Sequence, residues 1–507
     1  MKIKTLSRSL DSHAPASIGA PAPVSRNLDP SLHPFSQARE YTRALNAVKV
    51  ERMFAKPFVA ALEGHGDGVY VVEMDPERGN IVASGAGDGE IRLWNLPTRS
   101  LLQSIPRAHD SVIQSLCISP LTFSPSPSGL GTKRLLSCGT DRTIKLWDAN
   151  PDNGRMEVPE EGNDEDGTLG WLKEKEVDRT EPLLTWHSKT SFNSLTHHAS
   201  SPIFASSSNV IQLWDLSRGQ SSSSSSSTSA ALQTLKWGST TSDEAEAINV
   251  VKYNQSEPEL LLASGSSRSL NLYDTRSSSA IGGVKMKMRS NDLAWNPIEP
   301  TVFAVASEDQ NIYTFDMRNL SSATQIYKDH VSAVMSVSYS PTGQELVSGG
   351  YDRTVRLWNV GRGNHSRDVY HAARMQRVFS TKFTLDARFV LTGSDDGNLR
   401  LWKSRASEKL GILSGKELKA NEYRQALKKK YGGEGPGSSR NGGAGIGDIG
   451  KISRQRRVPK AIRSAQTLKR EMLEAERVKE DRRRKHTRKG LEKPKAARKD
   501  MILGKRE

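Results

Sequence analysis

Serine, histidine and aspartate recur together along this 507-residue chain, each time ahead of a tryptophan. These are the side chains of a hydrolase triad, in which an aspartate orients a histidine and the histidine activates a serine. A catalytic set should occur once, whereas this set is repeated along the chain. We therefore interpret it as a structural hydrogen-bond network that satisfies buried polar groups. The residues that we assign to this network are His65, Ser84, Asp88, Trp94, His109, Ser137, Asp141, Trp147, His330, Ser348, Asp352, Trp358, Thr392, Asp396 and Trp402.

The network residues belong to a longer repeated pattern. Small residues are followed by a turn that usually contains Asp, and then by an alternating strand that ends in an aromatic residue. The seven copies place that aromatic at Trp94, Trp147, Trp214, Tyr273, Phe315, Trp358 and Trp402. The last three separations, of 42, 43 and 44 residues, match the roughly 40–45 residues of a four-stranded propeller blade. The grouping resembles the buried network of WD-repeat blades, and the sequence predicts an all-β, seven-bladed WD-repeat β-propeller.

The first three separations are longer because the chain carries insertions there. Residues 150–168 are acidic and Gly-rich, and residues 220–229 are almost entirely Ser. Neither segment can bury apolar surface, so we expect both to be surface loops between strands.

The two ends of the repeat array suggest how the ring closes. No fourth strand of the last blade is recognisable after Trp402, whereas an unused apolar run, PFVAAL, precedes the first repeat at 57–62. Pairing this run with the last blade would remove two exposed sheet edges. We therefore expect an N-terminal extension at 1–56, a propeller at 57–402 closed by 57–62, and a C-terminal region at 403–507.

The net charge of +16 is concentrated in the C-terminal region. Residues 403–507 contain 32 Lys and Arg against 13 Asp and Glu, a balance of +19, so residues 1–402 carry −3. A basic tail on a near-neutral body is typical of an arm that binds a polyanion, most often nucleic acid. Within it we expect helices at about 415–430 and 464–489, separated by a Gly-rich linker at 431–450. The second helix has too little apolar surface to fold onto its own domain, so we expect it to order on a partner.

Several classes of protein are excluded by what the sequence lacks. Cys117 and Cys138 have no CxxC spacing and no His-rich motif beside them, so neither a zinc site nor a disulfide framework is indicated. There is no P-loop or Gly-rich dinucleotide fingerprint, no secretory signal, and no apolar run of the ~18 residues that a membrane span needs. We expect no enzyme activity, no cofactor, no small-molecule substrate and no membrane partner.

Several stretches go beyond a generic WD-repeat pattern. They include the pre-propeller segment at 27–69, SEDQNIYTFDMR at 307–318, SRDVYHAARMQRVFS at 366–380 and RLWKSRASEKLG at 400–411. The tail adds RQRRVPKAI at 454–462. On these stretches the chain resembles the suppressor-of-fibrillarin (Sof) family of WD-repeat proteins over almost its whole length. The Ser run, the acidic loop and the Gly-rich stretch depart from that pattern.

The resemblance implies a nuclear, nucleolar scaffold of the small-subunit processome. Its implied partners are processome proteins, the U3 small nucleolar ribonucleoprotein (snoRNP), and pre-rRNA or snoRNA. Its implied role is to support early pre-rRNA cleavage and 18S rRNA maturation. The tail residues that we expect to contact phosphate or an acidic partner are Arg454, Arg456, Arg457, Lys460, Arg463, Arg482, Arg483, Arg484 and Lys485. A solvated charged helix or a nuclear-import signal is the alternative for this segment.

A second function is open from the propeller. Some WD-repeat proteins that dock on the adaptor of a cullin-RING ubiquitin ligase end consecutive blades with aromatic-Asp-x-Arg. This chain carries that ending twice, with Asp274 and Arg276 after Tyr273, and with Asp316 and Arg318 after Phe315. The alternative prediction is therefore a substrate receptor of such a ligase.

Overall fold

The computed structural model describes residues 35–119, 123–125, 131–149, 181–216, 231–235, 237, 246–361, 363–431, 459–487 and 496–506. Both predicted insertions, 150–168 and 220–229, lie outside these ranges, as do Arg454, Arg456 and Arg457. The chain separates into two compact units, one of residues 1–55 with 407–457 and the other of residues 56–406 with 458–507. Among the described helices none is long and apolar enough to cross a membrane.

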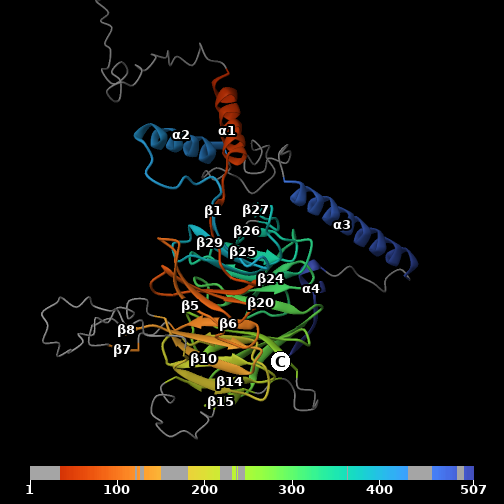
Figure 1. Cartoon of the computed structure of the whole chain (residues 1–507). Helices are drawn as coiled ribbons and strands as arrows, with labels where there is room; N and C mark the ends of the chain where they lie inside the picture. Colours follow the sequence, from red (N-terminus) through yellow and green to blue (C-terminus); the bar gives the residue numbers. More distant parts are fainter. Residues whose placement is uncertain are drawn as a thin grey trace, which may run out of the picture. The chain divides into compact units, whose positions relative to one another are not determined.

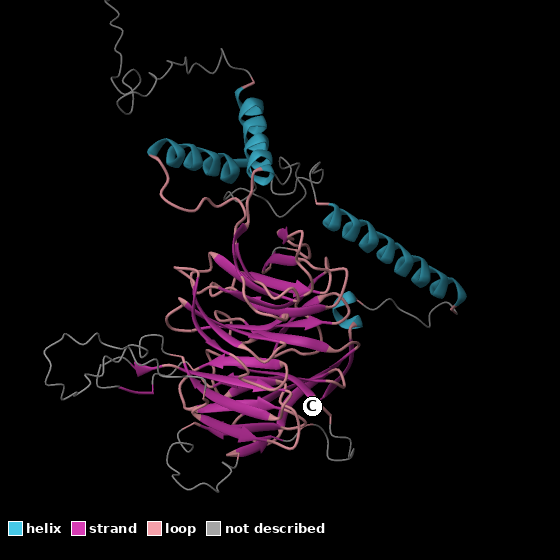
Figure 2. Ribbon diagram, in the orientation of Figure 1, coloured by secondary structure: helices cyan, strands magenta, loops and turns pink. Residues whose placement is uncertain are grey.

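Strands dominate the second unit (Figure 2). They form seven antiparallel blades of four strands, and blade four has a fifth strand in addition. Blade one contains β2 (Val69–Met74), β3 (Ile81–Ala86), β4 (Ile91–Asn95) and β5 (Ser100–Ile105). Blade two contains β6 (Ile113–Ile118), β9 (Arg134–Gly139), β10 (Thr143–Asp148) and β11 (Leu184–His187), with the short ribbon β7 (Phe123–Pro125) and β8 (Gly131–Thr132) between its first two strands. Blade three contains β12 (Ser194–His197), β13 (Ile203–Ser207), β14 (Ile211–Asp215) and β15 (Gln233–Leu235).

The remaining blades follow in chain order (Figure 1). Blade four contains β16 (Ile248–Tyr253), β17 (Leu260–Gly265), β18 (Ser269–Asp274), β19 (Ala280–Met286) and β31 (Ile502–Arg506). Blade five contains β20 (Ser290–Trp295), β21 (Val302–Ser307), β22 (Ile312–Asp316) and β23 (Gln325–Tyr327). Blade six contains β24 (Val334–Tyr339), β25 (Glu345–Gly350), β26 (Val355–Asn359) and β27 (Asp368–Tyr370). Blade seven contains β28 (Val378–Phe383), β29 (Phe389–Ser394), β30 (Leu399–Lys403) and β1 (Phe58–Leu62).

The first long strand of each blade makes the ring. These strands contact one another in the order β2, β6, β12, β16, β20, β24 and β28, and β28 contacts β2 again. Polar side chains link neighbouring blades: the Val337 N–H donates to Asp292 Oδ2 at 2.9 Å, and the Val72 N–H donates to Ser380 Oγ at 3.1 Å. The predicted seven-bladed propeller is confirmed.

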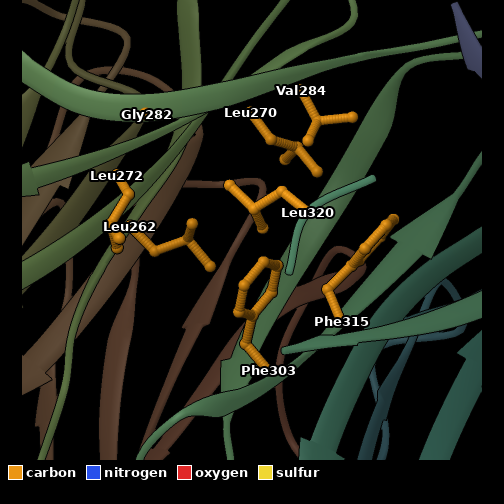
Figure 3. A pocket seen from close by; sticks show the side chains of 8 residues that line it. All are labelled: Leu262, Leu270, Leu272, Gly282, Val284, Phe303, Phe315 and Leu320. Carbon is orange, nitrogen blue, oxygen red and sulfur yellow. The ribbon is translucent and has the colours of Figure 1, made fainter. Parts of the chain in front are cut away.

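Apolar side chains fill the spaces between the blades. The second strands β3 and β9 are buried at every position, because each sheet is covered on both faces. Figure 3 shows one such space, where Leu262, Leu270 and Val284 of blade four face Phe303 and Phe315 of blade five. Burying side chains of this size contributes about 1.5–3 kcal/mol each.

The N-terminal strand completes the last blade. β1 pairs antiparallel with β30, with Phe58 opposite Trp402 and Leu62 opposite Leu399. Leu62 is buried with Leu391 and Leu401 in the core on this side of blade seven. The ring is therefore closed by a strand from before the first repeat, and we retain 57–402 as the proposed limits of the propeller.

Two helices form the described part of the other unit. α1 (Ser36–Met53) packs on α2 (Gly415–Tyr431) through Ala44, Val48, Leu427 and Tyr431. The Tyr431 hydroxyl donates to Glu40 Oε2 at 2.7 Å. α2 therefore lies close to the helix expected at about 415–430.

The rest of the described tail belongs to the propeller unit. α3 (Lys460–His486) begins four residues before the predicted helix, and α4 (Ala497–Asp500) leads into β31. The prediction that the helix at 464–489 would not fold onto its own domain is wrong in part, because Lys469 Nζ donates to Gln310 Oε1 of blade five at 2.8 Å. β31, which was not predicted, pairs with β19. Among the described residues of this part of the tail, the buried apolar side chains are Ile462, near the start of α3, and Met501, just before β31.

Candidate functional site

The Ser, His and Asp residues of blades two and six form a complete network. In blade two the His109 ring bonds Asp141 Oδ2 through Nδ1 (2.8 Å) and Ser137 Oγ through Nε2 (2.7 Å), and the Trp147 indole N–H donates to Ser137 Oγ at 2.8 Å. His330, Ser348, Asp352 and Trp358 repeat these three bonds in blade six, at 2.8, 2.7 and 2.8 Å. Both Ser side chains are fully buried and already bonded to two rings. They link a strand to a turn and have no access to a substrate.

The carboxylates of these two networks are held in the ionised form. Burial opposes ionisation of Asp141, but its hydrogen bond with His109 lowers the pKa of the carboxyl to about 2. Asp352 is more deeply buried, and the adjacent His330 holds its pKa far below the usual range. Charge-assisted bonds of this kind are stronger than neutral ones.

Blade one departs from the predicted network. His65 Nε2 lies 2.7 Å from Ser84 Oγ, which also accepts the Trp94 indole N–H at 2.7 Å. Asp88 does not reach the ring and instead caps the Glu90 N–H at 3.1 Å. The nearest acidic atom to His65 Nδ1 is Glu90 Oε2 at 3.7 Å. Burial of the ring, together with the nearby Arg92, lowers the pKa of His65 to about 4.

Blade seven also departs from the prediction. The Trp402 indole N–H donates to Thr392 Oγ1 at 2.8 Å, as expected. Asp396, however, pairs with Arg400 rather than with a His. His371, the histidine that precedes this blade in the sequence, is half-buried and bonds the Arg353 carbonyl at 2.9 Å. The cause is local, because the Arg400 guanidinium occupies the carboxylate from within the same hairpin.

The middle blades use other residues that the sequence pattern did not reveal. In blade four, Glu246 Oε2 accepts the Trp237 indole N–H at 2.8 Å and the Ser267 hydroxyl at 2.6 Å. Ser267 occupies the turn position that Asp occupies in blades two and six. Glu246 was not found because it lies two residues before β16, where no other repeat carries a Glu.

The two aromatic-Asp-x-Arg endings have nearly identical geometry. Arg276 bonds Asp274 with its backbone N–H (3.0 Å) and with Nε (3.0 Å) and Nη2 (2.8 Å) of the guanidinium. Arg318 makes the same three bonds to Asp316 at 3.0, 3.1 and 2.9 Å. The bond from Arg276 lowers the pKa of Asp274, and Arg318 does the same for Asp316. Both arginine side chains are more than two thirds exposed, so each is a fixed cation facing solvent.

The described basic residues of the tail lie along α3. Lys460, Arg463, Arg482, Arg483, Arg484 and Lys485 are all exposed on this helix. Arg484 pairs with Glu480 one turn earlier. Ile462, Ala465, Lys469 and Met472 are the buried and half-buried positions of the helix, and their spacing places them on one face. The cluster at 482–485 therefore lies beyond the part of α3 that is covered.

Comparison with known proteins gives a consistent assignment. A Sof1-like domain model matches residues 404–502, and the WD domain, G-beta repeat model matches 56–95, 99–148, 321–359 and 365–403. The blades that the second model leaves unmatched include three and four, where Ser replaces the turn Asp. The chain is 38% identical over 471 residues to Protein SOF1 of Saccharomyces cerevisiae, covering 92% of this chain and 88% of that protein.

Vertebrate relatives carry a different name. The chain is 38% identical over 490 residues to DDB1- and CUL4-associated factor 13 of Homo sapiens and to that of Xenopus laevis, covering 97% of this chain and 96% of each relative. Identity of this level over both propeller and tail is decisive, and the chain belongs to the Sof1 family of WD-repeat proteins.

Proposed function

We propose that this chain is a non-catalytic scaffold of ribosome biogenesis that acts in the nucleolus within the small-subunit processome. There it supports early pre-rRNA cleavage and 18S rRNA maturation. The observation that carries the proposal is the 38% identity to Protein SOF1 over 92% of the chain. The propeller supports it as well, because the complete Ser–His–Asp sets of blades two and six are buried and fully engaged in structural bonds.

The basic tail is the part of the scaffold proposed to reach RNA. Exposed Arg and Lys groups contact phosphates, which position a protein but carry little sequence information. The proposed contacts are Arg454, Arg456, Arg457, Lys460, Arg463, Arg482, Arg483, Arg484 and Lys485. The proposed ligands are pre-rRNA or snoRNA, and the blade rims would bind processome proteins and the U3 snoRNP.

A depletion experiment tests the scaffold role. The cellular protein is depleted and replaced by the wild-type chain or by a variant with Arg482, Arg483, Arg484 and Lys485 all changed to Glu. We expect the wild type to restore early pre-rRNA cleavage and 18S rRNA, and the variant to restore neither fully. A propeller variant with Arg99→Glu and Lys189→Glu, both exposed, is the control. Normal 18S rRNA after depletion would contradict the proposal.

A second function is favoured by the two exposed arginines. The relatives named DDB1- and CUL4-associated factor 13 carry the names of a ligase adaptor and a cullin. In this chain Arg276 and Arg318 are each held by an Asp in the same geometry, with the guanidinium exposed to solvent. We propose that this face of blades four and five docks on a cullin-RING adaptor. Changing Arg276 and Arg318 to Glu should abolish recovery of the adaptor in a pull-down and leave pre-rRNA cleavage intact. Arg289→Glu is a matched exposed control, and unchanged recovery in the double variant would exclude this surface.

A further inference from the structure

The outer edge of blade four is covered by the C-terminal strand. β31 pairs antiparallel with β19, with Gly283 opposite Arg506 and Lys285 opposite Gly504. The ladder extends beyond the strands, because the Lys287 N–H donates to the Met501 carbonyl at 2.9 Å. The Ala323 N–H of blade five donates to the Arg498 carbonyl at 3.1 Å. The segment 496–506 is therefore bonded to two neighbouring blades by its main chain.

One side chain anchors this segment. Met501 is 4% exposed and belongs to the same core cluster as Met286, Leu320 and Ala323. The half-buried Ile502 packs against that cluster. Leu503, the next residue, points the other way and is 55% exposed. Burial of a Met side chain contributes about 1.5–3 kcal/mol, so Met501 accounts for much of the binding.

The edge itself is suited to accept a strand. β19 has seven residues, whereas the described fourth strands of the other blades have three to six. A long outer strand presents a row of N–H and C=O groups that can pair with another chain. Gly283 keeps β19 close to its inner neighbour, because a Cβ there would lie 2.5 Å from Asn271 Oδ1.

We propose that the outer edge of blade four is a peptide-binding site of the strand-addition type, and that residues 496–506 are its resident ligand. The ligand class is an extended segment with an apolar residue at the position of Met501, immediately before the strand. Main-chain bonds supply affinity and the apolar pocket supplies selectivity, as in other sites of this type. The ion pair of Lys287 and Asp500 is exposed and adds little to the affinity.

Tethering makes the resident segment a strong competitor. An intramolecular ligand on a short linker has an effective concentration in about the millimolar range. A partner strand can therefore take this edge only when the tail is withdrawn or when the partner binds at a second place as well. The covered edge also keeps two copies of the chain from pairing through β19.

Cleavage of the linker tests whether the segment is held by the edge. A protease site is placed within residues 488–495 of the full chain, and the folded protein is cut. We expect the C-terminal fragment to co-elute with the propeller in size-exclusion chromatography. Met501→Asp should release the fragment, while Leu503→Asp, its matched neighbour, should retain it. Release of the wild-type fragment, or equal release by the two variants, would overturn the proposal.

Hydrogen exchange and an added peptide complete the test. In the uncut chain, amides of residues 280–287 should exchange at least tenfold faster in Met501→Asp than in wild type or Leu503→Asp. A labelled peptide of residues 496–507 should bind the Met501→Asp protein and restore this protection, whereas the same peptide with Asp at 501 should not. Both peptides are added to the same Met501→Asp protein, so any folding defect of the variant affects both equally. Failure of the wild-type peptide to bind would count against the site only if exchange elsewhere in the propeller were normal. If exchange were fast throughout, the cleaved wild-type chain decides the outcome.

Discussion

Asp352 and Asp88 occupy the same turn position in blades six and one but have different surroundings. Asp352 is buried against His330, whereas Asp88 bonds only a backbone N–H among the described contacts. Asp352→Asn should lower the free energy of unfolding by about 3 kcal/mol, because it neutralises a buried carboxylate that bonds the His330 ring and pairs with the buried Arg356. Asp88→Asn should cost less than about 1 kcal/mol. Denaturant unfolding followed by tryptophan fluorescence measures both, and equal losses would contradict the network geometry.

The residue two places after this Asp explains which networks the sequence could predict. In blades two and six it is Thr143 and Thr354, whose hydroxyls donate to Oδ1 at 2.8 Å and leave Oδ2 for the His. Blade one has Glu90 there, and no such bond orients Asp88. Spacing alone therefore predicted the bond from Trp to Ser in blades one, two and six and to Thr in blade seven, but the complete network only in blades two and six. The Asp-x-Thr spacing, which only the turns of blades two and six carry among the repeats with this Asp, is the sequence signal that distinguishes them.

Two buried histidines should make the propeller sensitive to mild acid. Burial lowers the pKa of His65 and of His197 to about 4, below the ordinary value of 6.5. As the pH is lowered, these histidines therefore bind protons in the unfolded chain before they do so in the folded chain. Their titration leaves the free energy of unfolding unchanged above about pH 6.5 and lowers it progressively as the pH falls toward 4. The expected slope is up to about 1.4 kcal/mol per pH unit for each histidine.

The pH experiment has a direct control. Unfolding free energies are measured at pH 7.0, 5.5 and 4.5 for the wild type and for His197→Gln, which removes one of these two histidines. The variant should show a shallower profile than the wild type. A flat wild-type profile over this range would contradict the buried, neutral state of the two rings.

β1 is the element on which closure of the ring depends. Leu62 is 3% exposed within blade seven, whereas Leu101 on the outer strand β5 is 44% exposed. Leu62→Ala should cost about 2–4 kcal/mol and Leu101→Ala less than about 1 kcal/mol, although both remove the same atoms. Chemical unfolding of the two variants compares a closing strand with an ordinary outer strand. Equal costs would show that β1 does not hold blade seven.

The elements that repeat were the ones that sequence could predict. Seven aromatic-ended strands fixed the number of blades, and strong helix formers located α2 and α3 within a few residues. β31 was missed because five residues with a central Gly carry almost no strand signal, and because their partner β19 is more than two hundred residues away in the chain. Pairing of that kind depends on an available edge, which appears only once the blade has formed.

At the scale of the whole molecule, the point where the net charge changes along the chain does not coincide with the limits of the two compact units. The charge balance changes from −3 to +19 at about residue 403, but the tail after it belongs to two compact units. Residues 407–457 join the N-terminal extension, and residues 458–507 join the propeller. The sequence therefore shows that the tail is basic, but it did not predict that the tail divides between two folded units. That division depends on the burial of a few side chains that are far apart in the chain.

Binding of RNA by this tail should depend strongly on salt. Each phosphate neutralised by Lys or Arg releases counterions, and for single strands the logarithm of the affinity falls by about 0.7 per contact for each tenfold rise in salt. The full chain should therefore lose affinity for a single-stranded RNA between low and moderate salt, with little dependence on sequence. Changing Arg482, Arg483, Arg484 and Lys485 to Ala should lower the slope by about 0.7 for each side chain that contacts phosphate. The exposed pair Arg99→Ala and Lys189→Ala should leave the slope unchanged, since a charge that makes no phosphate contact releases no counterion. A flat salt titration of the wild type would mean that the tail serves a protein partner rather than RNA.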